Sequence, residues 1–252
     1  MIDRNTLIHM LDDELTPSRF KDYTVNGLQV EGRERIGRIM GGVTACEALI
    51  DEAIAWQADA VLVHHGYFWK NEPAQVTGMK RRRLAKLLAH DINVLAYHLP
   101  LDAHPSLGNN AQLGQLMGWT FTGVLDGPVG QGLLYEGTLS TPMTHDALTQ
   151  HMGEVLERRP LMIQGHDRPI ERIAWCTGGA QDMIEAARAA GVDAFVSGEI
   201  SERTTHIARE EGISYFSAGH HATERCGVQA LGDWLSERAD IEFRFVDIDN
   251  PV

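Results

Sequence analysis

The chain has 252 residues, of which 43% are hydrophobic and 23% charged. This is the composition of a globular protein, and it excludes the disordered, collagen-like and coiled-coil classes. Because 22 Lys and Arg stand against 35 Asp and Glu, the net charge is −13, which repels a phosphate polyanion and excludes bulk nucleic-acid binding.

No apolar run approaches the roughly 18–20 residues of a membrane helix, and the N-terminal segment is acidic where a secretory signal would be basic. Cys46, Cys176 and Cys226 are far apart and favour reduced thiols over a disulfide framework. We therefore expect a cytoplasmic protein that binds no membrane.

Helices and strands are expected to alternate along the first half of the chain. The apolar residues of segment 3–15 recur at helical spacing, and Thr44-x-x-Glu47 is the pattern of a capping box. The predicted elements are a helix at 3–15, a strand at 35–43, a helix from the capping box to about Ala55, a strand at 59–65, a helix at about 80–89, a strand at 92–98, and a turn and helix within 101–118. This order predicts an α/β fold with mainly parallel strand pairing.

The second half repeats the first. Ile36–Ala60 placed over Ile170–Ala194, an offset of 134, gives eight identities in 25 positions. A strand ending at His98 is answered by one ending at His220, now at an offset of 122, which places Asp102 over Glu224.

We therefore expect two related α/β repeats with mainly parallel or mixed sheets, and a metal site between them. The repeats are assigned to residues 1–126 and 127–252. The expected features of the second repeat are a join at Gly127–Gly132, a strand at Tyr135–Leu139 and a helix at Thr144–Leu156.

Three histidine clusters follow predicted strands: His64-His65, His98 with Asp102, and His220-His221 with Glu224. Ligands of parallel α/β sheets bind beyond the carboxyl ends of the strands. Imidazole and carboxylate together suit divalent Zn, Mn, Fe, Ni or Co. A single His-x-x-x-carboxylate pair is often accidental, and adjacent histidines of a strand alternate faces. Two matched pairs and a third His-His favour a metal site, and only both repeats together supply enough ligands for two ions.

Other residues have both a functional and a structural interpretation. Glu199 falls on His65 at the offset of 134, which makes it the candidate for proton transfer, with a helix-cap role as the alternative. His98 is a ligand, a partner that orients Asp102, or a buried structural histidine. The basic run Lys80–Lys86 is a solvated helix face or a phosphate contact, and we expect Tyr67, Phe68 and Trp69 to serve packing or an interface rather than base stacking. No nucleotide-binding Gly motif and no evident covalent nucleophile is found.

Five segments carry a resemblance to a known family. They are NGLQVEG (26–32), ADAVLVHHGYFWK (58–70), YHLPLDAHPSLGNNAQL (97–113), GVDAFVSGEISE (191–202) and SAGHHATERCGVQAL (217–231). The chain resembles the Nif-three-like family, often labelled GTP cyclohydrolase type-two homologues. The resemblance implies two intertwined α/β repeats, two divalent metal ions per chain and a ring-shaped homohexamer. It also implies the ligands His64, His65, Asp102, His220 and Glu224, with Glu224 bridging the ions.

Residues and resemblance together favour a dinuclear-metal-dependent hydrolase acting on a small nucleotide-like substrate. The reaction would be ring opening of the GTP cyclohydrolase type or phosphoester cleavage, with Glu199 and His98 as candidate catalytic residues. The alternative is a non-catalytic scaffold that binds metal or a partner. Open coordination positions distinguish a catalytic site from a closed structural one.

Overall fold

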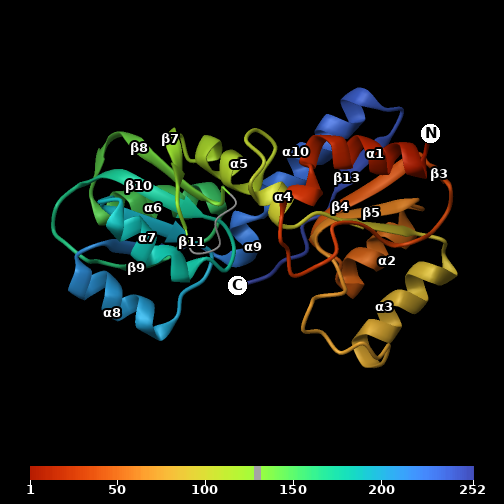
Figure 1. Ribbon diagram of the computed structural model, residues 1–252, viewed down its shortest axis with the longest axis horizontal. Helices are drawn as coiled ribbons and strands as arrows, with labels where there is room; N and C mark the ends of the chain where they lie inside the picture. The colour runs from red at the N-terminus through yellow and green to blue at the C-terminus, as the bar shows by residue number, and fades with distance from the viewer. Residues whose placement is uncertain (128–131) are drawn as a thin grey trace. The chain divides into compact units, whose positions relative to one another are not determined.

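The computed structural model describes residues 1–127 and 132–252 as a mixed α/β protein, as the sequence predicts (Figure 1). It divides into two compact units. Unit 1 comprises Met1–Gly108 and Gly227–Asp249, and unit 2 comprises Asn109–Cys226 and Asn250–Val252. Of the expected join at 127–132, residues 128–131 lie outside the described residues, and the assignment of the repeats to 1–126 and 127–252 stays a prediction.

Unit 1 is built on a five-stranded sheet in the order β13-β4-β5-β6-β2, with β4, β5, β6 and β13 parallel and β2 antiparallel. The strands β1 and β3 form a separate, small antiparallel pair. The strands are β1 (Ile2–Asp3), β2 (Gly27–Val30), β3 (Arg35–Ile36), β4 (Arg38–Thr44), β5 (Ala60–His65), β6 (Asn93–Ala96) and β13 (Glu242–Phe245). The helices are α1 (Arg4–Leu15), α2 (Glu47–Ala55), α3 (Gly78–Ala89), α4 (Leu99–Asp102) and α10 (Arg225–Arg238), with a 3-10 turn at Pro17–Arg19.

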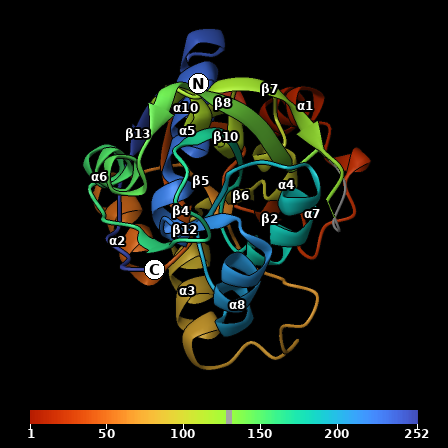
Figure 2. The same ribbon diagram turned by 90° about the vertical axis from the view of Figure 1, so that its left-hand side faces the viewer.

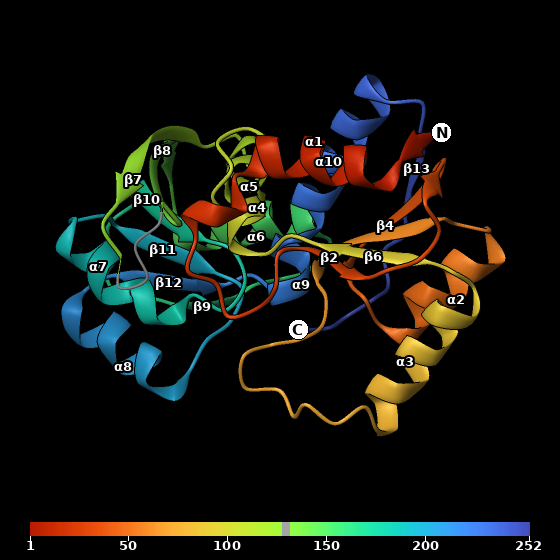
Figure 3. The ribbon, with the colours of Figure 1, turned by 45° about the vertical axis from the view of Figure 1, so that its right-hand side comes forward.

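Side-chain alternation along the strands of unit 1 gives the sheet two apolar faces. One face, with Val61 and Val63, packs against α2 and α3. The other, with Ala60 and Leu62, packs against α1 and α10. Figure 3 shows these two helix pairs on opposite sides of the sheet. The continuous apolar run of β5 is therefore explained by burial on both faces.

Unit 2 has a six-stranded sheet in the order β7-β8-β10-β11-β12-β9, in which only the β10-β11 and β11-β12 pairs are parallel among the described strands. The strands are β7 (Thr120–Leu125), β8 (Leu134–Met143), β9 (Leu161–Ile163), β10 (Ile170–Cys176), β11 (Ala194–Ser197) and β12 (Ser214–Ser217). The helices are α5 (Asn109–Leu116), α6 (His145–Leu156), α7 (Ile184–Ala189), α8 (Glu202–Glu211) and α9 (His220–Thr223), with a 3-10 turn at Gln181–Met183. Helices α5 and α6 pack on one face of the sheet, and α6 and α7 lie on opposite sides of the strands in Figure 2.

The internal repeat is confirmed in the strand register. Ile39 pairs with Ala60 in unit 1, and Ile173 pairs with Ala194 in unit 2, each at the offset of 134. Of the helices within the described residues, none has the length and apolar character needed to cross a membrane.

Candidate metal centre

The carboxyl ends of β5 and β6 bring three histidines of unit 1 together. His64 and His65 end β5, and His98 follows β6. Their ring centroids are 4.6 Å (His64–His65), 5.0 Å (His64–His98) and 5.7 Å (His65–His98) apart. One ring nitrogen of each lies within 4.8 Å of the corresponding atoms of the other two. Three convergent imidazoles are a donor set that fits a borderline divalent ion.

Each imidazole is oriented through its Nδ1 atom. The Nδ1 of His64 is 3.0 Å from the carbonyl oxygen of Tyr97, and the Nδ1 of His65 is 3.3 Å from the hydroxyl of Thr44. The Nδ1 of His98 is 2.8 Å from Asp22 Oδ1. Such contacts fix the ring and its tautomer in metal sites, and they leave Nε2 as the nitrogen that can bind an ion.

The contact of Thr44 corrects one sequence prediction. Helix α2 begins at Glu47 with Cys46 as its N-cap, and no side-chain cap bond is formed there. The capping box expected at Thr44-x-x-Glu47 is wrong because Thr44 is the last residue of β4, where its hydroxyl lies beside His65.

Asp102 lies beside the buried histidine. It ends the short helix α4, which begins after His98 and has proline in its first turn. Asp102 Oδ1 is 3.4 Å from His64 Nε2, and both residues are buried. Asp102, which the sequence analysis pairs with His98, thus lies beside His64.

Asp22 is a residue of the candidate site that the sequence analysis missed. Its carboxylate contacts His98 Nδ1 and accepts hydrogen bonds from the Leu99 amide and the Asn26 side chain. Burial opposes its ionisation, but the bond and charge of His98 and these amides outweigh burial and lower the pKa of Asp22 to about 2. Asp22 is therefore an ionised carboxylate that orients the His98 ring.

Unit 2 gathers a histidine and two carboxylates at the carboxyl ends of β11 and β12. His220 Nδ1 is 2.7 Å from Glu199 Oε1, and His220 Nε2 is 3.2 Å from Glu224 Oε2. Burial lowers the pKa of His220, but the hydrogen bonds and charges of Glu224 and Glu199 outweigh it and raise the pKa to about 9. The two carboxylates thus favour positive charge at His220.

A glycine leaves room for this group. Gly178 has φ +67°, and a Cβ there would collide with Glu224 Oε1 and lie 3.1 Å from His220 Nε2. Glu224 itself is 2% exposed. A buried carboxylate packed against bare backbone and an imidazole fits a metal ligand, since buried charges are paired or coordinate metals.

The two histidine-carboxylate pairs differ by one residue in their distance from the preceding strand. Strand pairing places Asn93 opposite Ala60 and Ser214 opposite Ala194, which is an offset of 121 between β6 and β12. The sequence offset of 122 therefore includes one additional residue after β12. As a result His98 caps α4, whereas Gly219 caps α9 and His220 is its first residue.

The basic run on α3 is largely used in ion pairs within unit 1. Arg82 and Lys86 pair with Glu47 of α2, and Lys80 pairs with Glu72. These pairs support the interpretation of the run as a helix face rather than a phosphate site.

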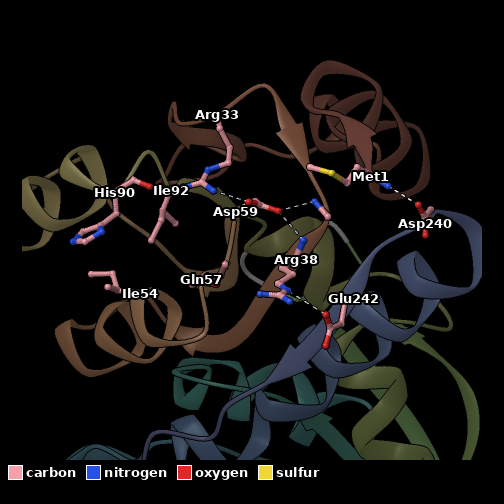
Figure 4. Close-up of a pocket in the computed structure, with 12 residues that line it drawn as sticks. Met1, Arg33, Arg38, Ile54, Gln57, Asp59, His90, Ile92, Asp240 and Glu242 are labelled. Carbon is pink, nitrogen blue, oxygen red and sulfur yellow. Dashed lines mark hydrogen bonds and ion pairs between the residues drawn. The ribbon is translucent and has the colours of Figure 1, made fainter.

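A cavity of about 860 Å³ lies at the opposite, amino edge of the unit 1 sheet (Figure 4). Its charged groups are bound to one another. Asp59 pairs with Arg33 and accepts the amides of Gly37 and Arg38, and Arg38 also pairs with Glu242. Asp193 accepts the equivalent amides in unit 2, so Asp59 serves to anchor the strand ends.

The comparisons with known proteins decide the family. The model of the family described as Duf34/NIF3 (NGG1p interacting factor 3) matches residues 2–251. The chain belongs to this family. The resemblance inferred from the sequence is thereby confirmed.

Individual Duf34/NIF3 relatives match this chain along its length. It is 55% identical over 96% of its length to a Vibrio cholerae protein named GTP cyclohydrolase 1 type 2 homolog, of which it covers 97%. A Pseudomonas aeruginosa protein of the same name is 53% identical, with 98% of each chain covered. A solved structure described as protein ybgI, of unknown function, is 48% identical with a TM-score of 0.96, and all of both chains is covered. The protein TTHA1606 from Thermus thermophilus is 31% identical, with a TM-score of 0.88 over all of both chains.

Proposed function

We propose that the chain is a metal-dependent hydrolase that acts on a small nucleotide-like substrate and holds two divalent ions. The ligands would be His64, His65 and Asp102 of unit 1 with His220 and Glu224 of unit 2. The observation that carries the proposal is the convergence of the oriented imidazoles of His64 and His65, with the ring of His98 beside them, at the carboxyl edge of the unit 1 sheet. The buried Glu224, with His220 beside it, supports a second set of donors.

Two bound divalent ions would supply an acidified water and a clamp for the attacked group. The chain's own residues would orient the donors. The carbonyl of Tyr97, the hydroxyl of Thr44 and the carboxylate of Asp22 each fix one imidazole.

Glu199 is the residue proposed to move a proton. Its Oε1 is bound to the ring of His220, and its side chain is 38% exposed, so its second oxygen can exchange a proton with a substrate atom. His98 is the other candidate, because it is fixed by Asp22 and lies against both His64 and His65.

The substrate class rests on the relatives. They are named as homologues of a GTP cyclohydrolase, which supports a purine nucleotide or a related compound. Both C–N ring opening and phosphoester cleavage are compatible with this donor set.

Metal content tests the site. The purified chain, supplied with Mn, Zn, Fe or Ni, is expected to bind about two ions by elemental analysis, as a two-metal site requires. Glu224→Ala should lower the occupancy of both positions, while Glu210→Ala, an exposed change on α8, should lower neither. Binding of no ion would contradict the proposal, and loss of only one ion in Glu224→Ala would contradict the bridging role.

Turnover tests the reaction. The loaded protein incubated with a library of nucleotides and cofactors should convert at least one of them, as read by mass spectrometry, and Glu224→Ala should not. Two bound ions without any turnover would favour a metal-binding scaffold over a hydrolase.

A homohexameric ring is also proposed, on the family resemblance. Light scattering is expected to give about six times the chain mass of 27.9 kDa, and a monomer at micromolar concentration would contradict it.

A further inference from the structure

Two aromatic side chains border the imidazole group of unit 1. The Trp69 ring is 5.1 Å from His98 in an edge-on contact and 5.9 Å from His65. The Tyr23 ring is 5.7 Å from His98. The two aromatic residues thus come from segments far apart in the chain and meet at the same imidazole.

The two aromatic side chains are more exposed to solvent than the imidazoles of His64 and His98. His64 is fully buried and His98 is 9% exposed, whereas Tyr23 is 46% exposed and Trp69 is partly exposed. Aromatic rings that stay exposed beside a buried polar cluster offer π surface to a ligand that approaches the cluster.

Hydrogen bonds between and within the two segments fix the backbone that carries these rings. The Lys70 amide donates to the Tyr23 carbonyl at 2.7 Å, and the Thr24 hydroxyl donates to the Tyr67 carbonyl at 2.9 Å. The Glu72 amide donates to the Trp69 carbonyl at 2.9 Å. Because the backbone on both sides is fixed, a ligand would meet a preorganised surface and would pay little for ordering it.

The neighbouring aromatics have other partners. The hydroxyl of Tyr67 donates to the Ala45 carbonyl in the core, and the Phe68 ring is covered by the ammonium of Lys80 at 5.2 Å. The expectation of packing roles therefore suits Tyr67 and Phe68, but Trp69 differs because it lies beside the candidate ligand His65 and the candidate catalytic residue His98.

We propose that Tyr23 and Trp69 form the surface on which a planar heteroaromatic ring of the substrate stacks, beside the imidazoles that hold the metal. This rests on the proposed function and adds the residues that select for a ring. Stacking on aromatic side chains is tolerant of ring identity, so the surface would favour a class of bases and leave finer choice to other contacts.

The test compares two probes on the Mn²⁺-loaded protein by calorimetry. Guanosine 5′-monophosphate carries a base, and ribose 5-phosphate has the same sugar and phosphate without it. Trp69→Leu is expected to weaken guanosine monophosphate by about 5- to 150-fold, the loss of one stacked base, and to leave ribose 5-phosphate unchanged. Trp69→Phe, which keeps an aromatic face, should retain most of the affinity, and Tyr23→Leu should give a loss in the same direction.

Trp56→Leu is the matched control, since Trp56 is a partly exposed tryptophan of the same unit that lies over Arg38. It should change neither affinity. Equal binding of the two probes to the wild-type chain, or an equal loss of both in Trp69→Leu, would overturn the proposal. A lower metal content in Trp69→Leu would also overturn it, because the tryptophan would then only shield the imidazoles. Absence of turnover with base-selective binding intact would instead reject the hydrolase and leave the stacking surface in place.

Discussion

The two units carry equivalent residues at the amino ends of their parallel strands and different residues at the carboxyl ends. At the amino edge, Asp59 and Asp193 each accept two consecutive backbone amides and pair with an arginine. At the carboxyl edge, the offset of 134 sets Thr44 against Gly178 and His65 against Glu199. Unit 1 thus presents imidazoles, and unit 2 a histidine between two carboxylates. The repeated anchor preserves the register, while the donor chemistry at the other edge is free to diverge.

The largest effect on turnover is expected at Glu199, which stands in the second repeat where the first repeat has His65. Glu199→Gln keeps an acceptor for His220 Nδ1 but removes the titrating group. On a verified substrate, kcat should fall by roughly 10²–10⁴-fold with metal content unchanged. Glu199→Ala should also lower metal content, since His220 loses its orienting partner. The control is Glu202→Gln, an exposed change on α8; unchanged turnover in Glu199→Gln would remove it from the mechanism.

The two aspartate anchors offer a direct comparison of stability. Asp59→Ala should destabilise unit 1 by about 3 kcal/mol, because charged hydrogen bonds are lost and backbone amides are left without a partner. The Asp193 side chain is 20% exposed against 11% for Asp59. Asp193→Ala should therefore lower the stability of unit 2 by less, about 1–2 kcal/mol. Urea unfolding measures the loss, and hydrogen exchange locates it. Exposed Asp233→Ala is the control, and a larger loss for Asp193→Ala would contradict the comparison.

The exchange of Thr44 for Gly178 can be tested at the glycine. Gly178→Ala requires a left-handed backbone from alanine, which costs about 1–2 kcal/mol, and its Cβ must displace Glu224. Metal content should therefore fall along with the thermal midpoint. Gly118→Ala also has positive φ but nothing within 4 Å of its Cβ, so it should lose stability and keep its metal. Full metal content in Gly178→Ala would show that the glycine is not needed for the site.

A smaller effect, on the pH dependence of stability, is expected from His145 and His166, which lie together in unit 2. Burial, and then the charge of His166, lower the pKa of His145, against the opposing charges of Asp146 and Asp167. Since the unfolded chain keeps the ordinary value of 6.5, it binds more protons, and stability is lost as pH falls below 6.5. His145→Gln should reduce the drop in thermal midpoint between about pH 7.5 and about pH 5.5, and exposed His9→Gln should not. An equal drop in all three proteins would contradict this assignment.

The strongly periodic elements were predictable from the sequence. Helix α1 follows the spacing of its buried residues Leu7, Leu11 and Leu15, and β5 follows an apolar run. The clusters at the strand ends could also be predicted, because the carboxyl edge of parallel strands follows from the β-α alternation. The edge strand β13 was not assigned, since its short sequence EFRF carries charges at alternate positions and buries little.

The orienting contacts could not be predicted. Asp22 lies 76 residues before His98 in the chain, and nothing in a lone aspartate indicates such a partner. Thr44 was misassigned because a cap pattern has the same letters whether its hydroxyl faces a helix amide or, as in the structure, His65. Such contacts depend on tertiary packing, which overrides a local preference.

The pairing of β13 with β4 has a consequence for synthesis. Glu242 pairs with Arg38, so the edge of the unit 1 sheet needs a strand made after all of residues 109–226. On a ribosome, the inserted unit leaves the exit tunnel before the unit that encloses it has its full sequence. The usual order, in which the N-terminal domain folds first, is therefore not required here, because unit 2 can complete its sheet before β13, the outer neighbour of β4, has been synthesised.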